Sequence, residues 1–263
     1  MKSKKILFSI LKTLGVIAFW TLIWVLISFR INNEFLFPSP TSVIKTLCDL
    51  GATAEFWQTT AYSLLRVLSG IIISLVVGSL LAIITQGSRL MSAVLSPLLS
   101  VIKATPVASF IILALLWINR NTLPLFITSL IVIPIVWSNV SEGIASVNKN
   151  LREVTKVYKF SPWQRIRRLY VPSVAPYFMA ACRSSLGMAW KAGISAEVLS
   201  TPQSAIGTEL YFSKTYLETP SLFAWTFVVI LLSVLIEKLF VYLLERLGSR
   251  LHILVEVDDN DKA

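Results

Sequence analysis

Apolar residues gather in long blocks that contain no charged residue, and polar residues fill the gaps between these blocks. The charge-free blocks cover residues 13–29, 67–88, 104–119, 121–141 and 219–236. A helix needs about 20 apolar residues to cross the hydrocarbon core of a bilayer, and it satisfies its own backbone hydrogen bonds there. The alternation of apolar and polar residues that outer-membrane strands require is absent from the sequence. The pattern therefore predicts an all-α integral membrane protein.

We predict a bundle of six transmembrane helices. The expected spans are residues 6–29, 62–86, 92–118, 123–147, 173–199 and 221–244. The segment Lys103–Pro106 interrupts the third span, because proline lacks a backbone donor and kinks a helix. The second span contains Gly70, Ser74 and Gly78 at four-residue spacing, which favours close packing of helices.

These spans predict the organisation of the whole chain. Residues 1–30 form an N-terminal transmembrane helix, and residues 31–60 form an external, periplasmic segment. Residues 61–248 form a five-helix core with a polar loop at 148–172, and residues 249–263 form a cytoplasmic tail. His252, the only histidine, lies in this tail and is expected to be solvated.

Charge supports this interpretation and gives an orientation. Only 14% of the residues are charged, whereas soluble domains carry about 25%. The net charge of +10 comes from Lys and Arg in the gaps between apolar blocks, which indicates membrane orientation rather than nucleic-acid binding. Six spans and an excess of basic residues on one side place both termini in the cytoplasm. The two cysteines lie in separate segments and predict no disulfide or metal pair.

The longest polar stretch in the body of the chain predicts two short helices. Leu151, Val154 and Val157 with Tyr158 fall on one face of the first helix. Ser161 can cap the second helix, with Pro162 in its first position and Gln164 completing a capping box. Pro172 is expected to end that second helix. The basic residues of this stretch are Lys149, Arg152, Lys156, Lys159, Arg165, Arg167 and Arg168.

The spacing in this loop resembles the cytoplasmic coupling loop of the permease subunits of bacterial binding-protein-dependent, ATP-binding-cassette importers. Glu153, Leu169 and Pro172 match the family pattern, and Lys159 stands where glycine is usual. Other segments resemble the nitrate/sulfonate/taurine branch of that family. They are Pro38-Ser39-Pro40, Ser63–Arg66, Ala104–Val107, Leu186–Trp190 and Ala196-Glu197.

The resemblance implies a permease that is docked on a dimer of ATP-binding-cassette ATPases, receives its solute from an external binding protein and pairs with a second permease copy. It implies an ATPase-coupling segment of Arg152, Glu153, Val154, Val157, Tyr158, Lys159, Phe160, Leu169 and Pro172. Glu153 and Arg152 would form the polar rim of the docking face. The alternative for this basic loop is a surface held by anionic lipid. The sequence contains no phosphate-binding loop, so ATP hydrolysis is assigned to a partner and no cofactor is expected.

Ionisable residues within spans are costly and usually face a cavity or a partner. Candidates for the translocation pathway are therefore Lys191, Glu197, Arg183 and the break at Pro106. The competing interpretation is that Lys191 and Arg183 reach toward the membrane interfaces, and that Glu197 pairs structurally. Lys191 points to a small anionic solute. The alternatives are a vitamin precursor such as a pyrimidine, or an ATP-independent transporter or channel.

Overall fold

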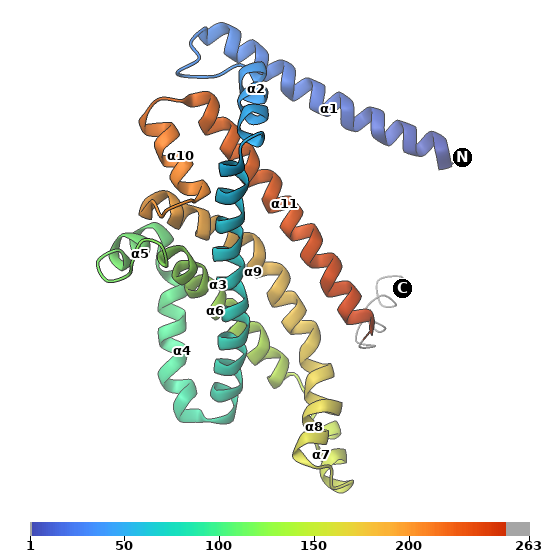
Figure 1. The fold of residues 1–263 in the computed structure, drawn as a ribbon. Helices are drawn as coiled ribbons and strands as arrows, with labels where there is room; N and C mark the ends of the chain where they lie inside the picture. The colour runs from blue at the N-terminus through green and yellow to red at the C-terminus, as the bar shows by residue number, and fades with distance from the viewer. Residues whose placement is uncertain (1, 251–263) are drawn as a thin grey trace.

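The computed structural model describes residues 2–250, and in this part of the chain all the regular secondary structure is helical. Its elements are α1 (Lys2–Ile31), α2 (Pro40–Gly51), α3 (Ala54–Gly87), α4 (Arg89–Ala104), α5 (Val107–Ala114), α6 (Leu123–Ala145), α7 (Lys149–Val157), α8 (Pro162–Arg165), η1 (Ile166–Tyr170), α9 (Val171–Ser200), α10 (Ile206–Thr215) and α11 (Thr219–Arg250). Figure 1 places α7 and α8 at the end of the molecule opposite α2 and α10. The tail residues 251–263, with His252, lie outside the described residues.

Helix α6 lies between α3 and α9, and glycines allow the close contacts in this core. A Cβ on Gly78 of α3 would lie 2.8 Å from the Cβ of Val136 in α6. A Cβ on Gly193 of α9 would lie 2.5 Å from a methyl carbon of Val67 in α3. Because real Cβ atoms do not approach so closely, these positions accept only glycine without movement of a neighbour. The packing role predicted for the glycines of the second span is confirmed.

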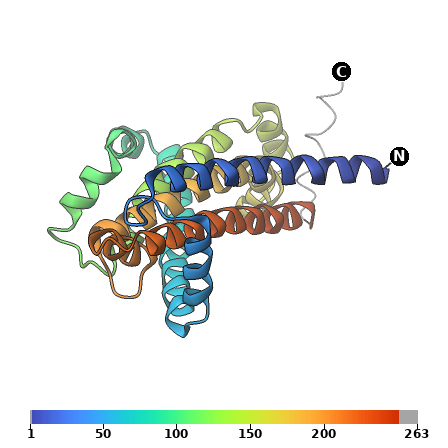
Figure 2. The same ribbon diagram turned by 90° about the horizontal axis from the view of Figure 1, so that it is seen from above.

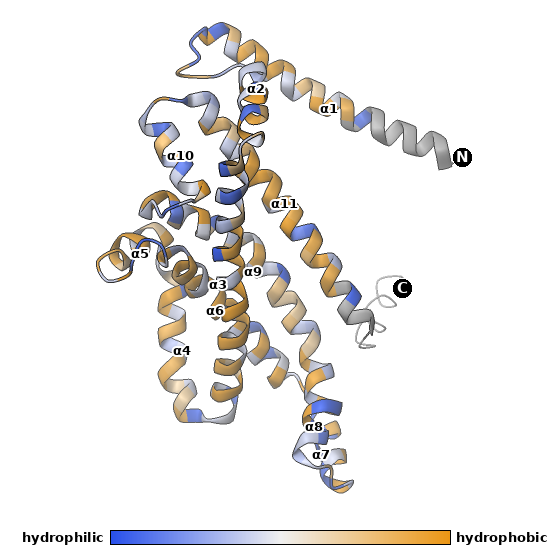
Figure 3. Cartoon of the chain, in the orientation of Figure 1, coloured by the Kyte–Doolittle hydropathy of each residue, from blue (hydrophilic) through white to orange (hydrophobic). Residues whose placement is uncertain are grey.

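Four of the described helices are long and apolar enough to cross a membrane, and five spans result if the bent pair α4–α5 counts as one. Figure 3 shows the apolar colouring along these helices and the polar residues of the connecting segments and of α7–α8. Helix α9 is not among these helices, and it carries the charged residues Arg183, Lys191 and Glu197. An all-helical membrane protein is confirmed, and the fifth predicted span, residues 173–199, corresponds to this polar helix.

The interruption predicted at Lys103–Pro106 is a sharp corner. Helices α4 and α5 meet there at 106°. Pro106 is the N-cap residue of α5 and cannot donate a backbone hydrogen bond to α4. Helix α5 then packs on α6 and α9 through Ile111 and Ala114, both of which are buried. The single kinked helix expected at 92–118 is therefore two helices.

Helix α1 projects away from the rest of the chain and is held near its C-terminal end (Figures 1 and 2). The indole of Trp24 lies against the rings of Phe37 and Phe223, which brings α11 to the same cluster. Its Nε1 atom donates to the carbonyl oxygen of Pro38 at 3.0 Å. From Leu14 onward, most of the apolar side chains of α1 are exposed, as expected for a helix that faces lipid or another chain.

Two helices extend past a predicted boundary. The helix that holds the second span begins at Ala54, before residue 62, because the Thr53 side chain caps it by accepting from the backbone N–H of Phe56. Pro172 does not end a helix: α8, η1 and α9 follow one another without a break, and Pro172 lies in the first turn of α9. A π turn at Ile166–Tyr170 widens the hydrogen-bond ladder just before this proline.

Candidate coupling segment and translocation surface

Helix α7 presents apolar side chains to the outside. Leu151, Val154, Val157 and Tyr158 are 50%, 46%, 78% and 73% exposed, and they lie along the face that the periodicity predicts. Glu153 is exposed at the edge of this face. This arrangement is unusual for a solvated surface helix, which buries its apolar side. We call the four apolar residues the α7 face.

The C-terminal end of α7 is a tight cap. Lys159 adopts a left-handed conformation with φ of 51°. The N–H of Lys159 donates to the carbonyl of Lys156, and the N–H of Phe160 donates to the carbonyl of Thr155, both at 3.0 Å. This is the Schellman arrangement, in which glycine is the preferred residue. The geometry explains why the family pattern has glycine where this chain has Lys159.

The segment after the cap is also fixed locally. Ser161 and Gln164 form the predicted capping box: the Gln164 N–H donates to Ser161 Oγ, and the Ser161 N–H donates to Gln164 Oε1. The Phe160 ring lies 5.8 Å from the guanidinium carbon of Arg168, and Phe160 is half-buried. Leu169 is only 6% exposed and belongs to the interior. Pro172 is exposed at the start of α9.

Arg152 is placed on the inner side of α7, away from the α7 face. Its Nη2 donates to the carbonyl oxygen of Ile144 at 3.2 Å, and its guanidinium carbon lies 5.8 Å from the centre of the Tyr170 ring. The side chain is half-buried. Arg152 thus contacts α6 and η1 instead of forming the rim of the α7 face.

Helix α9 has two chemically different sides. One side is buried against α3, α6 and α11, with Trp190 Nε1 donating to the carbonyl of Val229 at 3.1 Å. The other side carries small, polar and basic residues, together with two large apolar ones, and all of them are exposed in the single chain. These residues are Ala180, Arg183, Ser184, Met188, Lys191, Ser195 and Leu199. Lys191 and Arg183 therefore share one surface, which we call the α9 stripe.

Glu197 lies on the buried side of α9 and is fully enclosed. Its Oε2 accepts from Ser63 Oγ at 2.8 Å and from the Gly207 N–H at 3.1 Å. Its Oε1 lies 3.5 Å from Nη1 of Arg66. The carboxylate thus joins α9 to α3 and to the start of α10. This position agrees with the interpretation that Glu197 pairs structurally.

The connection between α9 and α10 is fixed by hydrogen bonds that the sequence did not predict, although Ser63 and Arg66 belong to a segment that resembles the family. Ser63 Oγ also accepts from the Ile206 N–H at 2.9 Å, and Asn121 Oδ1 accepts from the Gln203 N–H at 3.0 Å. The Arg66 guanidinium donates to the carbonyls of Gln203 and Ser204. Ser63 and Arg66 are one helical turn apart, so their side chains lie on the same face of α3.

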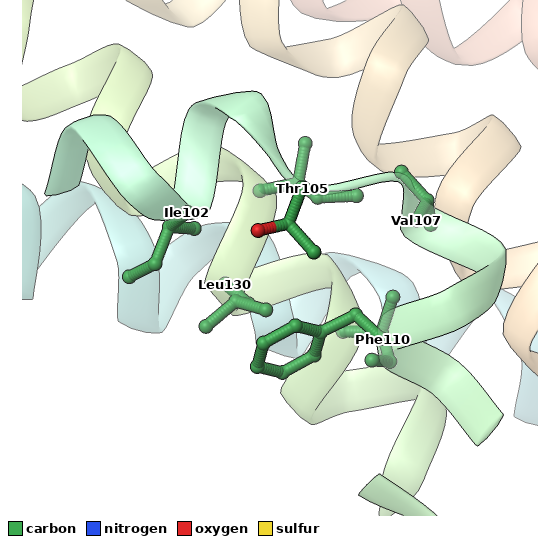
Figure 4. Close-up of a pocket in the computed structure, with 7 residues that line it drawn as sticks. Ile102, Thr105, Val107, Phe110 and Leu130 are labelled. Atoms are coloured by element: carbon green, nitrogen blue, oxygen red, sulfur yellow. The ribbon is translucent and has the colours of Figure 1, made fainter. Parts of the chain in front are cut away.

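A small apolar cavity lies at the α4–α5 corner, and Thr105 and Val107, the two neighbours of Pro106, line it. Figure 4 shows Thr105 and Phe110 facing Leu130 of α6 across it. The cavity has a volume of 10 Å³, which is about the space of one water molecule. It is therefore a packing defect at the corner and cannot hold a solute.

Comparison with known families identifies the class of protein. Residues 70–249 match the model of the binding-protein-dependent transport system inner membrane component. This match covers most of the chain, and the chain belongs to that family. It is a multi-pass inner-membrane permease subunit of an ATP-binding-cassette transporter, and ATP is hydrolysed by a separate subunit. Membership implies an ATPase and a binding protein as partners. The resemblance seen in the loop and in the span motifs is confirmed.

Several curated relatives are similar over much of the chain. The putative aliphatic sulfonates transport permease protein SsuC of Bacillus subtilis is 25% identical over 88% of this chain and 82% of that protein. The formylaminopyrimidine transport permease protein ThiX of Halalkalibacterium halodurans is 26% identical over 81% and 85%. The bicarbonate transport system permease protein CmpB of Synechocystis is 30% identical, with 58% of this chain matched to 54% of that protein.

The fold is also similar to that of solved transporter chains. A chain of the MetNI methionine ABC transporter in an inward-facing conformation matches with a TM-score of 0.53 at 17% identity. The match covers 74% of this chain and 93% of that chain. This likeness supports the fold of the permease.

Proposed function

We propose that this permease imports a small anionic solute, that the α7 face docks on the ATPase, and that the α9 stripe lines the translocation pathway. The chain crosses the membrane six times, with α4–α5 and α9 as two of the spans, and both termini are cytoplasmic. Two copies form the transporter, because one chain supplies one coupling segment and two-fold pairs are the commonest assembly. ATP-driven closure of the ATPases moves α7 and alternates access to the pathway.

The observation that carries the docking proposal is the exposed α7 face on a rigid helix. A protein surface that exposes apolar side chains in one row marks a partner site. The family requires an ATPase partner. The Schellman cap closes the C-terminal end of α7, and the capping box at Ser161 starts the next helix, α8. A basic surface for anionic lipid would not need the row of Leu151, Val154, Val157 and Tyr158.

The α9 stripe supports the choice of an anion. Lys191 and Arg183 are eight residues apart, about two helical turns, on the same side of a helix whose other side is packed. Positively charged side chains along a pathway attract anionic solutes and repel cationic ones. Charged side chains inside a membrane are costly, and they commonly mark the pathway of a substrate or ion. Two of the relatives are named as permeases for aliphatic sulfonates and for bicarbonate, which agrees with this choice.

A formylaminopyrimidine-like solute is the second candidate, because the ThiX protein is similar over most of both chains. Such a solute carries no obligatory negative charge, so it would not depend on Lys191. Lys191→Met in cells with the native partners separates the two candidates. We expect uptake of the anion to fall several-fold while the amount of permease in the membrane is unchanged, with Lys214→Met on α10 as the control. Normal anion uptake in Lys191→Met would contradict the anion proposal.

The docking proposal is tested with Val157→Asp and Lys156→Glu. Both substitutions add a carboxylate to an exposed position of α7, but Val157 lies in the α7 face and Lys156 lies beside it. We expect Val157→Asp to abolish co-purification of the ATPase in mild detergent, because a charge would be buried in an apolar contact. Lys156→Glu should retain the ATPase. Retention of the ATPase by Val157→Asp would refute docking at the α7 face.

A further inference from the structure

Arg152 differs from its neighbours on α7 in what its side chain contacts. Among the described residues of α7, it is the one whose side chain donates a hydrogen bond to another helix. The acceptor, the carbonyl of Ile144, lies in the last turn of α6, where carbonyls have no partner within the helix. A guanidinium at that position also interacts favourably with the helix dipole.

The same guanidinium reaches the second helix that forms the core. It lies over the ring of Tyr170, the last residue of η1, and η1 leads directly into α9. The ends of α6 and α9 converge there, because a Cβ on Gly143 would lie 3.0 Å from the Cβ of Tyr177. Arg152 therefore spans the point where α7 meets both helices.

The far end of α7 is tied to η1 as well. The Phe160 ring contacts the guanidinium of Arg168, and the Schellman cap at Lys159 sets the direction of the chain between them. Helix α7 is thus fixed at both ends, by Arg152 near its start and by Phe160 after its end. A helix held at two points cannot pivot when its outer face is pushed.

We propose that Arg152 is a positioning residue that converts movement of α7 into joint movement of α6 and α9. This inference rests on the proposed docking of an ATPase at the α7 face. The planar guanidinium donates from one nitrogen to the Ile144 carbonyl while its central carbon lies over the Tyr170 ring, and the compact ammonium of a lysine cannot make both contacts. Loss of Arg152 leaves docking in place and makes the connection between α7 and the core loose.

The test compares Arg152→Gln with Arg167→Gln in the complete transporter. Both remove one positive charge from the same segment, and Arg167 is exposed on η1. Three quantities are measured: co-purified ATPase, ATP hydrolysed, and solute imported per ATP. For Arg152→Gln we expect the first two to persist and import per ATP to fall about tenfold, as the loss of a charged hydrogen bond suggests. Arg167→Gln should resemble the unmodified chain.

Two results would overturn the inference. Unchanged import per ATP would show that Arg152 does not transmit movement, and loss of the ATPase would make Arg152 part of the docking surface. If Arg152→Gln fails to accumulate in the membrane, Tyr170→Leu removes only the aromatic ring beneath the Arg152 guanidinium and must lower import per ATP, whereas Tyr170→Phe must not. Failure of the unmodified chain to retain an ATPase would instead refute the docking proposal.

Discussion

Lys159 shows how one backbone angle can explain a departure from a family pattern. Its φ of 51° is a conformation that costs a residue with a Cβ about 1–2 kcal/mol. The hydrogen bonds that Lys159 and Phe160 donate at the end of α7 offset this cost. The side chain of Lys159 is exposed and is not needed for the turn.

We therefore expect Lys159→Gly to stabilise the end of α7 by about 1 kcal/mol. Hydrogen exchange of the backbone amides of Tyr158, Lys159 and Phe160 should slow. Lys156→Gly is the matched control, because glycine inside a helix costs about 1 kcal/mol and should speed exchange. Faster exchange in Lys159→Gly would show that the left-handed turn is not the feature that selects glycine.

Glu197 and Lys191 show that two charges on one helix can have opposite environments. They are six residues apart on α9, so they point to different sides of it. Glu197 is enclosed by Ser63, Arg66 and the Gly207 N–H, whereas Lys191 is exposed on the α9 stripe. In the sequence both are charged residues within one apolar segment. Only the residues around them in the fold show that Glu197 belongs to a buried ion pair and that Lys191 is a surface charge.

At the scale of elements, the contact between α3 and α6 depends on the absence of side chains. Gly78 faces both the Cβ of Val136 and the carbonyl oxygen of Ile133, at 2.8 and 2.9 Å from an added Cβ. Neither neighbour is the flexible end of a side chain, so the helices themselves would have to move. Such overpacking costs about 1–3 kcal/mol.

We predict that Gly78→Ala lowers the thermal unfolding midpoint of the detergent-purified chain. Gly187→Ala on α9 is the control, because nothing lies within 4 Å of an added Cβ there. Alanine is the better helix former by about 1 kcal/mol, so the control should be neutral or stabilising. Equal midpoints for both variants would contradict the proposed tight contact at Gly78.

Three acidic residues from different segments meet at the α10 end of the whole molecule. Partial burial of Glu209 on α10 raises the pKa of its carboxyl group, and the charges of Glu55 and Glu218 raise it further. The folded chain thus holds a proton at Glu209 up to a higher pH than the unfolded chain does. Its contribution to stability is present at low pH and is lost as the pH rises through the raised pKa.

We accordingly expect the unfolding midpoint to decline between the ordinary glutamate pKa, about 4.3, and the raised pKa of Glu209. Glu209→Gln should remove that part of the decline and should be more stable than the unmodified chain above the raised pKa. Glu34→Gln, at an exposed position, serves as the control. An identical pH profile for Glu209→Gln would contradict the role of Glu209.

The sequence alone determined the class of this protein. In a bilayer, a charge-free block of about 20 residues forms all its backbone hydrogen bonds within itself only as a helix. The all-helical membrane fold therefore follows from the pattern of these blocks. Local hydrogen bonding likewise made the Ser161 capping box and the break at Pro106 predictable. The order of the loop and span motifs was sufficient to indicate the permease family.

The tertiary structure decided what local patterns cannot encode. The direction of Arg152, the enclosure of Glu197 and the roles of Ser63 and Asn121 depend on residues from 8 to 143 positions away in the chain. Pro172 was misjudged because a π turn, invisible in the hydrophobic periodicity, carries the helix past it. Helical periodicity reports which face of a helix is apolar, whereas the neighbours of a polar side chain are chosen by the packing of distant helices.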